Sequence, residues 1–203
     1  MDLLARLGMA FGPAWASGLN LYAMVATLGL LGRFGGLRLP GDLEVLTNKW
    51  VIGAALALYC VEFVADKIPL VDSVWDLIHT FLRIPAGAIV AAASLGDFNR
   101  PVQILGLLIG GGLALSSHTS KAATRAALNL SPEPFSNILA SLIEDVLAIA
   151  MSLLAFVVPI LILIAVAIFF GLTIWLLPKI VRLARRTFGA ARRFLRGTPQ
   201  LAG

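Results

Sequence analysis

The chain has 203 residues, of which 59% are hydrophobic and only 13% are charged, and its mean hydropathy is +0.92. These values lie far outside those of soluble domains, so we interpret the chain as an integral membrane protein. Intrinsic disorder of the body of the chain and a nucleic-acid-binding surface are both excluded, because neither is compatible with so apolar a composition.

The positive net charge comes from the C-terminal end. Of the sixteen Lys and Arg, nine lie in residues 1–178 together with all eleven Asp and Glu, and seven lie in residues 179–203 without an acid. An excess of Lys and Arg just after the last span favours a cytoplasmic C-terminus. We therefore expect a transmembrane helical domain over 1–178 and a basic amphipathic tail over 179–203 that contacts anionic lipid headgroups of the bilayer.

Runs of about 20 apolar residues, bounded by charges, Gly or Pro, indicate spanning helices. In chain order the expected elements are a half-helix over 3–11, a break at Gly12-Pro13, a span over 14–33, a loop over 34–47, a span over 48–67, a re-entrant hairpin or interrupted helix over 71–96, a long helix over 101–128, and apolar helices over 135–156 and 157–178. The predicted fold is an all-α integral membrane protein with about five to six spanning helices, some of them broken or re-entrant.

Two segments 100 residues apart are similar. GPAWASGLNLYAMVATLGL, from Gly12, aligns with GLALSSHTSKAATRAALNL, from Gly112, and Asn20 then faces Ser120. A duplication would give repeat halves of about 1–83 and 84–178, and repeats with broken helices are typical of transporters that bind a solute between the halves. Alternatively, the small residues serve only for close packing of helices.

Ionisable residues recur at helical spacing within or beside these helices. A charge at the centre of a span costs roughly 2.5–3.5 kcal/mol, so such groups usually face a cavity or a partner. The spacing predicts a buried ion-pair network made of Glu62, Asp66, Lys67, Asp72, Asp76, His79, Arg83, His118, Lys121, Arg125, Glu144 and Asp145. The alternative is that those near helix ends only cap or cross-link the helices. Glu144 and Asp145 lie inside an apolar run and need a partner, for which Arg125 or Lys121 is the candidate.

Signals for catalysis are weak. Asp72 and Asp76 form a D-x-x-x-D pattern that could hold a divalent cation, but the further Asp and Gly positions of phosphotransferase motifs are missing. No G-x-S-x-G, H-E-x-x-H or P-loop occurs, two histidines cannot build a His-rich metal centre, and the single Cys60 cannot form a disulfide within the chain. We therefore expect neither enzymatic activity nor a cofactor, and leave open whether the acids bind a metal.

Three strings in the sequence are distinctive: VEFVADKIPLVDSVWDLIHTFLRIPAGAIVAAASLGD, GGGLALSSHTSKAATR and LSPEPFSNILASLIED. They resemble a bacterial multi-pass membrane family known only as domain of unknown function 4126, and the resemblance covers roughly residues 5–165. It implies a protein of the bacterial inner membrane but no established activity. Its motif positions coincide with the polar residues singled out above, which favours a function over helix capping.

We expect a small secondary transporter or channel-like permease that moves an ion or small charged solute through the ionisable residues. In this hypothesis the acids bind a proton or cation, the cationic side chains pair with them or receive an anion, and Ser17 and Asn20 line the broken first helix. At this size a homodimer is expected. The alternatives are a lipid flippase or membrane phospholipid enzyme, and a membrane scaffold or assembly factor in which buried charges only specify packing.

Overall fold

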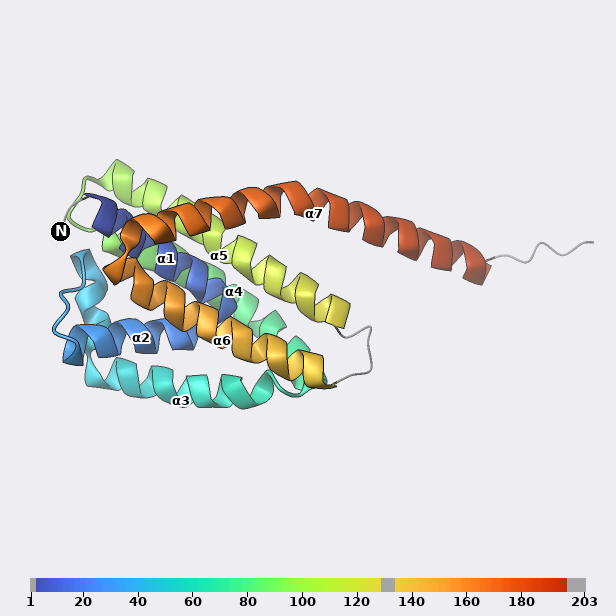
Figure 1. Ribbon diagram of the computed structural model, residues 1–203, viewed down its shortest axis with the longest axis horizontal. Coiled ribbons are helices and arrows are strands. Elements are labelled where there is room, and N and C mark those ends of the chain that lie inside the picture. The colour runs from blue at the N-terminus through green and yellow to red at the C-terminus, as the bar shows by residue number, and fades with distance from the viewer. Residues whose placement is uncertain (1–2, 129–133, 197–203) are drawn as a thin grey trace, which may run out of the picture. The chain divides into compact units, whose positions relative to one another are not determined.

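A computed structural model describes residues 3–128 and 134–196 of the chain, and these ranges are helical without a strand. The elements are α1 (Leu3–Leu19), α2 (Leu21–Phe34), the 3-10 helix η1 (Gly41–Thr47), α3 (Lys49–Ala65), α4 (Pro69–Ser94), α5 (Arg100–Leu128), α6 (Pro134–Val157) and α7 (Pro159–Arg196) (Figure 1). The predicted all-α class is confirmed. Residues 129–133, which follow α5, and the last seven residues of the predicted tail lie outside the described residues.

The chain divides into two compact units, residues 1–167 and 168–203. The first unit contains α1 to α6 and the start of α7. Four helical segments are long and apolar enough to cross a membrane, namely Val74–Ser94, Arg100–Leu128, Phe135–Val157 and Pro159–Leu176. A fifth span arises if η1 and α3, which meet at an angle of 71°, are counted as one broken span. The protein is therefore a multi-pass membrane protein.

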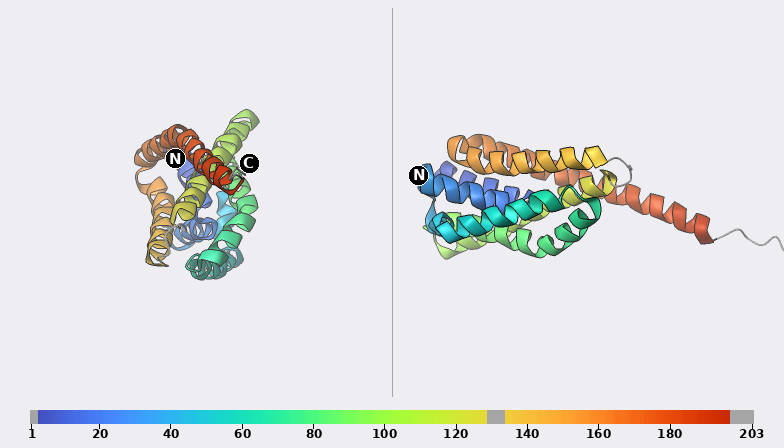
Figure 2. Two further views of the ribbon diagram at one scale, coloured as in Figure 1. Left: turned by 90° about the vertical axis from the view of Figure 1, so that its right-hand side faces the viewer. Right: turned by 90° about the horizontal axis from the view of Figure 1, so that it is seen from below.

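The predicted span over 14–33 is wrong, because the chain turns back at Asn20. The start of α1 lies at the α4–α5 connection, where Arg6 pairs with Asp97. The segment after α2 returns to the same connection, since a Cβ at Gly41 would lie 2.0 Å from the Ala93 carbonyl oxygen. Between these points the chain reaches only the middle of α4, where the Ser17 hydroxyl donates to the Arg83 carbonyl at 3.2 Å. Figures 1 and 2 show α1 and α2, in blue, side by side in one half of the bundle. They form a re-entrant hairpin.

The break falls at Asn20 rather than at Gly12-Pro13 for local reasons. Asn20 has extended backbone angles, φ −145° and ψ 103°, and its side-chain oxygen accepts from the Ala23 N–H at 2.8 Å, which caps α2. Asn is a preferred N-cap residue because its side-chain oxygen can accept this hydrogen bond. Pro13 lies inside α1 and leaves the Met9 carbonyl without its helical donor, but the Ser94 hydroxyl donates to that carbonyl at 3.1 Å. A neighbouring helix thus satisfies the group that Pro13 frees.

The re-entrant or interrupted helix predicted over 71–96 is also absent. The segment is one helix, α4, of 26 residues, and Pro85 lies within it. At 1.5 Å per residue this length is about 39 Å, enough to cross a bilayer. The polar N-terminal half of α4 does not need to end early, because its charged side chains are buried against other helices rather than exposed to lipid.

Glycines allow α1 to pack directly on α4 and α5. A Cβ at Gly18 would lie 2.0 Å from the Ser117 hydroxyl oxygen, and one at Gly87 would lie 2.6 Å from the Ser17 hydroxyl oxygen. The two segments matched as a repeat are therefore neighbours, but their backbones differ. The first turns at Asn20, whereas α5 continues without a break through Ser120.

Substitution of Gly18 tests this packing. Gly to Ala within a helix normally stabilises by roughly 0.5–1 kcal/mol, whereas overpacking costs typically about 1–3 kcal/mol. We expect Gly18→Ala to lower the melting temperature of the protein in detergent micelles. Gly53→Ala is the control, because a Cβ there meets no described atom within 4 Å and should leave the melting temperature unchanged or raised. Equal melting temperatures for the two variants would contradict the close packing of α1 on α5.

Candidate functional site

Nine charged side chains from four segments of the chain meet inside the first unit. All of them are at most 7% exposed. We call them the charged cluster: Glu62 on α3, Asp66 at its C-terminal cap, Asp72, Asp76 and Arg83 on α4, Lys121 and Arg125 on α5, and Glu144 and Asp145 on α6. The acids come from α3, α4 and α6, and the cations from α4 and α5. Residues predicted from sequence spacing are thus brought together in space.

Arg83 joins α4 to α3 at the deepest point of the charged cluster, with no side-chain exposure. One terminal nitrogen, Nη2, bonds to Glu62 Oε1, and the other, Nη1, lies 2.6 Å from Asp76 Oδ1. Such charge-assisted bonds are among the stronger ones in proteins. Arg83 therefore pairs with two buried acids, and it is the only ion-pair partner of Glu62 among the described residues.

Lys121 lies between three carboxylates from three different segments. Its Nζ is 3.1 Å from Asp66 Oδ2, 3.3 Å from Asp76 Oδ1 and 3.4 Å from Glu144 Oε2. The same ammonium lies 3.3 Å from the Leu19 carbonyl oxygen at the end of α1. A single cation thus connects α5 to α3, α4, α6 and the hairpin.

Arg125 is the partner expected for Glu144. Its Nη2 lies 2.7 Å from Glu144 Oε2, and its Nη1 donates to the Asn137 carbonyl at 3.0 Å. Its contact with Asp72 is much looser, with Nε 3.8 Å from Oδ2. Asp72 consequently has a weaker counter-charge than Glu144.

Asp145 has a different partner from the one the sequence suggested. The side-chain amide of Asn20, at the hairpin tip, donates to Asp145 Oδ1 at 2.8 Å. The N-terminus of α2 also lies at this tip, and a helix N-terminus favours a nearby negative charge. The C-terminus of α1, whose Leu19 carbonyl faces Lys121, favours a positive charge in the same way. The two helix ends at the tip therefore match the charges they face.

Two histidines border the charged cluster, and each contacts a hydroxyl that sequence reasoning missed. His118 Nε2 lies 2.7 Å from the Thr80 hydroxyl oxygen, and its Nδ1 lies 3.4 Å from Arg83 Nη1. His79 Nε2 lies 2.9 Å from the Tyr22 hydroxyl oxygen. Thr80 follows His79 on α4, and Tyr22 comes two residues after the break. In a single sequence, nothing marks a Thr or a Tyr at these positions as the partner of a histidine.

The charged cluster contains more acids than cations. Six buried acids face three buried permanent cations. Among the described residues, Glu62 Oε2, Asp66 Oδ1 and Asp72 Oδ1 are buried without a hydrogen-bond partner. Lys67 does not correct the imbalance through an ion pair, since its ammonium donates to the Phe63 carbonyl at 2.7 Å and lies over the Phe63 ring. Buried uncompensated carboxylates are costly, so this excess needs explanation.

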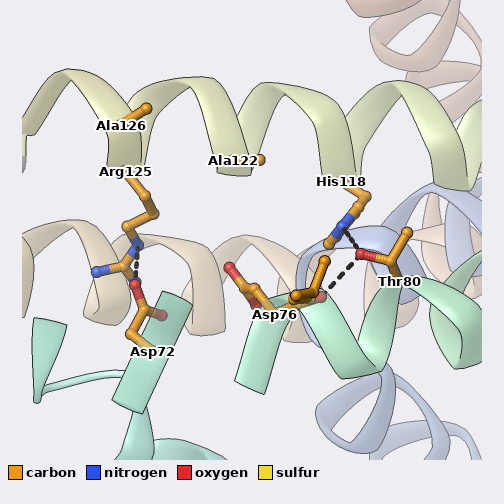
Figure 3. A pocket seen from close by; sticks show the side chains of 8 residues that line it. Asp72, Asp76, Thr80, His118, Ala122, Arg125 and Ala126 are labelled. Carbon is orange, nitrogen blue, oxygen red and sulfur yellow. Dashed lines mark hydrogen bonds and ion pairs between the residues drawn. The ribbon is translucent and has the colours of Figure 1, made fainter. Parts of the chain in front are cut away.

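A cavity of about 350 Å³ lies between α4 and α5 on one side of the charged cluster (Figure 3). Its lining residues are Asp72, Asp76, Leu77, Thr80, His118, Ala122, Arg125 and Ala126. Figure 3 shows the Asp72 side chain near Arg125 and that of Asp76 between them and His118. Asp72 precedes the span Val74–Ser94, and burial raises the pKa of its carboxyl while the charge of Arg125 opposes the rise. Two acids of the charged cluster, Asp72 and Asp76, thus line this cavity.

The role of Arg83 in stability can be measured. Removing one partner of a buried ion pair typically costs about 3–5 kcal/mol, because the other charge is left uncompensated. We expect Arg83→Leu to lower the free energy of unfolding in detergent micelles by about this amount, and the added changes Glu62→Gln and Asp76→Asn to recover part of it. Arg100→Leu, at an exposed residue that begins α5, is the control. A loss no larger than that of Arg100→Leu would contradict the assignment.

The comparisons with known proteins give a family but no activity. Neither the curated proteins nor the solved structures that were searched contain a match to the chain. A family model described as a domain of unknown function matches residues 7–179, which include every member of the charged cluster and the hairpin tip. The chain therefore belongs to the family called domain of unknown function 4126.

Proposed function

We propose that the protein is a small permease that moves a small cation, a proton or a metal ion, through the charged cluster. The observation that carries the proposal is the excess of acids, with six buried acids against three buried permanent cations among the described residues. Where hydrogen bonds such as that from Asn20 to Asp145 do not compensate it, such an excess is stabilised by protons on some carboxyls or by cations taken up by the charged cluster. Ionisable groups inside membrane helices are typical of ion pathways and proton relays.

The re-entrant hairpin supports the proposal. Transporters commonly bind ions where a discontinuous helix ends near the middle of the membrane, because free backbone groups and helix dipoles are available there. Here the Leu19 carbonyl and the Asn20 amide lie at such an end and contact Lys121 and Asp145. A displacement of the tip would change the surroundings of charges on α5 and α6 at once.

An anionic substrate is less well supported. The cationic side chains of α5, Lys121 and Arg125, would have to accept it, but both already lie within 3.4 Å of carboxylates. The cavity also contains Asp72 and Asp76, which repel a phosphate. We therefore do not carry forward a lipid flippase or a phospholipid enzyme, and leave the scaffold hypothesis as an outcome of the experiment below.

The membrane and the orientation are proposals as well. The family resemblance favours the bacterial inner membrane, and the seven cations after residue 178 favour a cytoplasmic C-terminus with the tail on anionic headgroups. A homodimer remains an expectation from the small size of the chain. Crosslinking in native membranes tests the dimer without affecting the proposal on transport.

Asp72 is the position at which to test transport. Among the described residues its only ion pair spans 3.8 Å, so Asp72→Asn removes a charge at the cavity with little loss of structure. Liposomes with the purified protein should show cation flux above that of empty liposomes, measured with a trapped pH dye under a potassium diffusion potential and with metal-sensitive dyes. We expect Asp72→Asn to lower the flux at least about tenfold, which corresponds to roughly 1.4 kcal/mol.

The matched control is Asp42→Asn, at an exposed residue of η1 far from the charged cluster, which should leave the flux unchanged. Melting temperatures establish that all three proteins are folded. If folded wild-type protein moves neither protons nor metal cations faster than empty liposomes, the permease proposal fails and the scaffold hypothesis is favoured. If Asp72→Asn and wild type have equal flux, the pathway does not use this carboxyl.

A further inference from the structure

Three aspartates of the charged cluster lie close enough together to share one ion. Asp66, Asp72 and Asp76 each offer a carboxylate oxygen, and these oxygens all lie within 4.8 Å of one another. The turn between α3 and α4 brings Asp66 beside the start of α4, where Asp72 and Asp76 are one helical turn apart on the same face. Three carboxylates at this spacing repel one another unless a positive charge lies between them.

The available cations satisfy these carboxylates unequally. Lys121 contacts Asp66 and Asp76 through one oxygen of each, whereas Asp72 has only the loose contact with Arg125. Asp66 Oδ1 and Asp72 Oδ1 have no hydrogen-bond partner among the described residues, although both residues are only 1% exposed. A carboxylate can accept about four hydrogen bonds or ligand contacts, so these oxygens are open to an added ligand.

The cavity provides room beside two of the three aspartates. Asp72 and Asp76 both line it, together with the Thr80 hydroxyl-bearing side chain. Its volume of about 350 Å³ is several times the roughly 30 Å³ that one water takes up in the liquid, so an ion can enter with part of its water shell. Figure 3 shows Asp72 and Asp76 on α4 facing α5 across this space.

The chemistry of the donors selects the ion. Carboxylate oxygens with water are the ligands of Mg²⁺, Ca²⁺ and Mn²⁺, and Mg²⁺ in particular keeps several waters and binds through one or two carboxylates. The charged cluster has three more acids than permanent cations, so a divalent ion compensates most of the excess and a monovalent ion only a third of it. Softer metals that prefer thiolate or several imidazoles find no such ligands among these three residues.

We propose that Asp66, Asp72 and Asp76 bind a hard divalent cation such as Mg²⁺ or Mn²⁺, with water from the cavity completing its coordination. This inference rests on the proposed permease function insofar as the bound ion is also the transported one. Lys121 then has a second role beyond structure. Its ammonium contacts two of the three ligands and competes with the ion for them, which keeps the site from holding a divalent cation too tightly for release.

Binding of Mn²⁺ to the purified full-length protein in detergent tests the site, because free and bound Mn²⁺ differ in their electron paramagnetic resonance signals. We expect wild type to bind one Mn²⁺ per chain, Mg²⁺ to displace it, and Asp72→Asn to weaken binding at least about tenfold, with Asp42→Asn unchanged. If folded wild type binds no Mn²⁺ at millimolar concentration, or if Asp72→Asn binds it as well as wild type, the proposed site is overturned.

A second variant keeps all three carboxylates and so guards against misfolding of Asp72→Asn. Ala122 lines the cavity on α5, so Ala122→Lys places a tethered ammonium beside the site and should weaken Mn²⁺ binding at least about tenfold. Ala127→Lys, at an exposed residue outside the cavity lining, is its control. Equal Mn²⁺ affinity in Ala122→Lys and Ala127→Lys would overturn the placement of the ion in this cavity.

The flux experiment separates the two proposals. Mn²⁺ binding that depends on Asp72, without flux of any cation, supports the metal site and contradicts the permease. Proton flux that depends on Asp72, without Mn²⁺ binding, overturns the metal site and leaves the permease in place. Both properties together, with Mn²⁺ itself crossing the membrane, support a divalent cation as substrate.

Discussion

Charge burial is the constraint on which the first unit depends. A carboxylate removed from water loses several kcal/mol of solvation, and only a close counter-charge or hydrogen bond repays it. Arg83, Lys121 and Arg125 each contact two or more acids, so the three cations join α3, α4, α5 and α6 in one network. Helices in a bilayer lack a strong hydrophobic drive to associate, because the lipid is as apolar as their side chains. The ion pairs and the close glycine contacts therefore fix which helices are neighbours.

The re-entrant hairpin follows from the same constraint. Its tip lies inside the bundle, where the backbone groups freed at the break need hydrogen-bond partners within the protein. Asn20 contributes two hydrogen bonds at the tip, since its side-chain oxygen caps α2 and its side-chain NH2 group donates to Asp145. Lys121 in turn satisfies the Leu19 carbonyl. The hairpin and the charged cluster thus stabilise each other, and the position of each depends on hydrogen bonds to the other.

The sequence predicts the helical membrane class and the members of the charged cluster well, because buried charges at helical spacing are rare and stand out in so apolar a chain. It fails where one residue decides the course of the backbone. Pro13 signals a break from sequence alone, yet Ser94, 81 positions away, satisfies the freed Met9 carbonyl and α1 continues. Asn20 signals little, yet the chain turns there, where Asn20 caps α2 and donates to Asp145. Thr80 and Tyr22 are missed for a related reason, since only the folded chain shows that their hydroxyls contact His118 and His79.

The pairing within the charged cluster is incomplete, as the proposed binding of a cation requires. If the six acids served only to specify helix packing, each would gain most from a close partner, as Glu144 does at 2.7 Å from Arg125. Asp145 and Asp72 depart from this pattern. Asp145 accepts from the Asn20 amide and has no ion pair among the described residues, whereas the nearest cation to Asp72 lies at 3.8 Å and Asp72 also lines a cavity. A fully paired network would hold its charges too firmly to exchange them with a solute. Under the proposed function, the weakest ion pair among the described residues of the charged cluster, Asp72 with Arg125, lies at the cavity from which a cation would arrive.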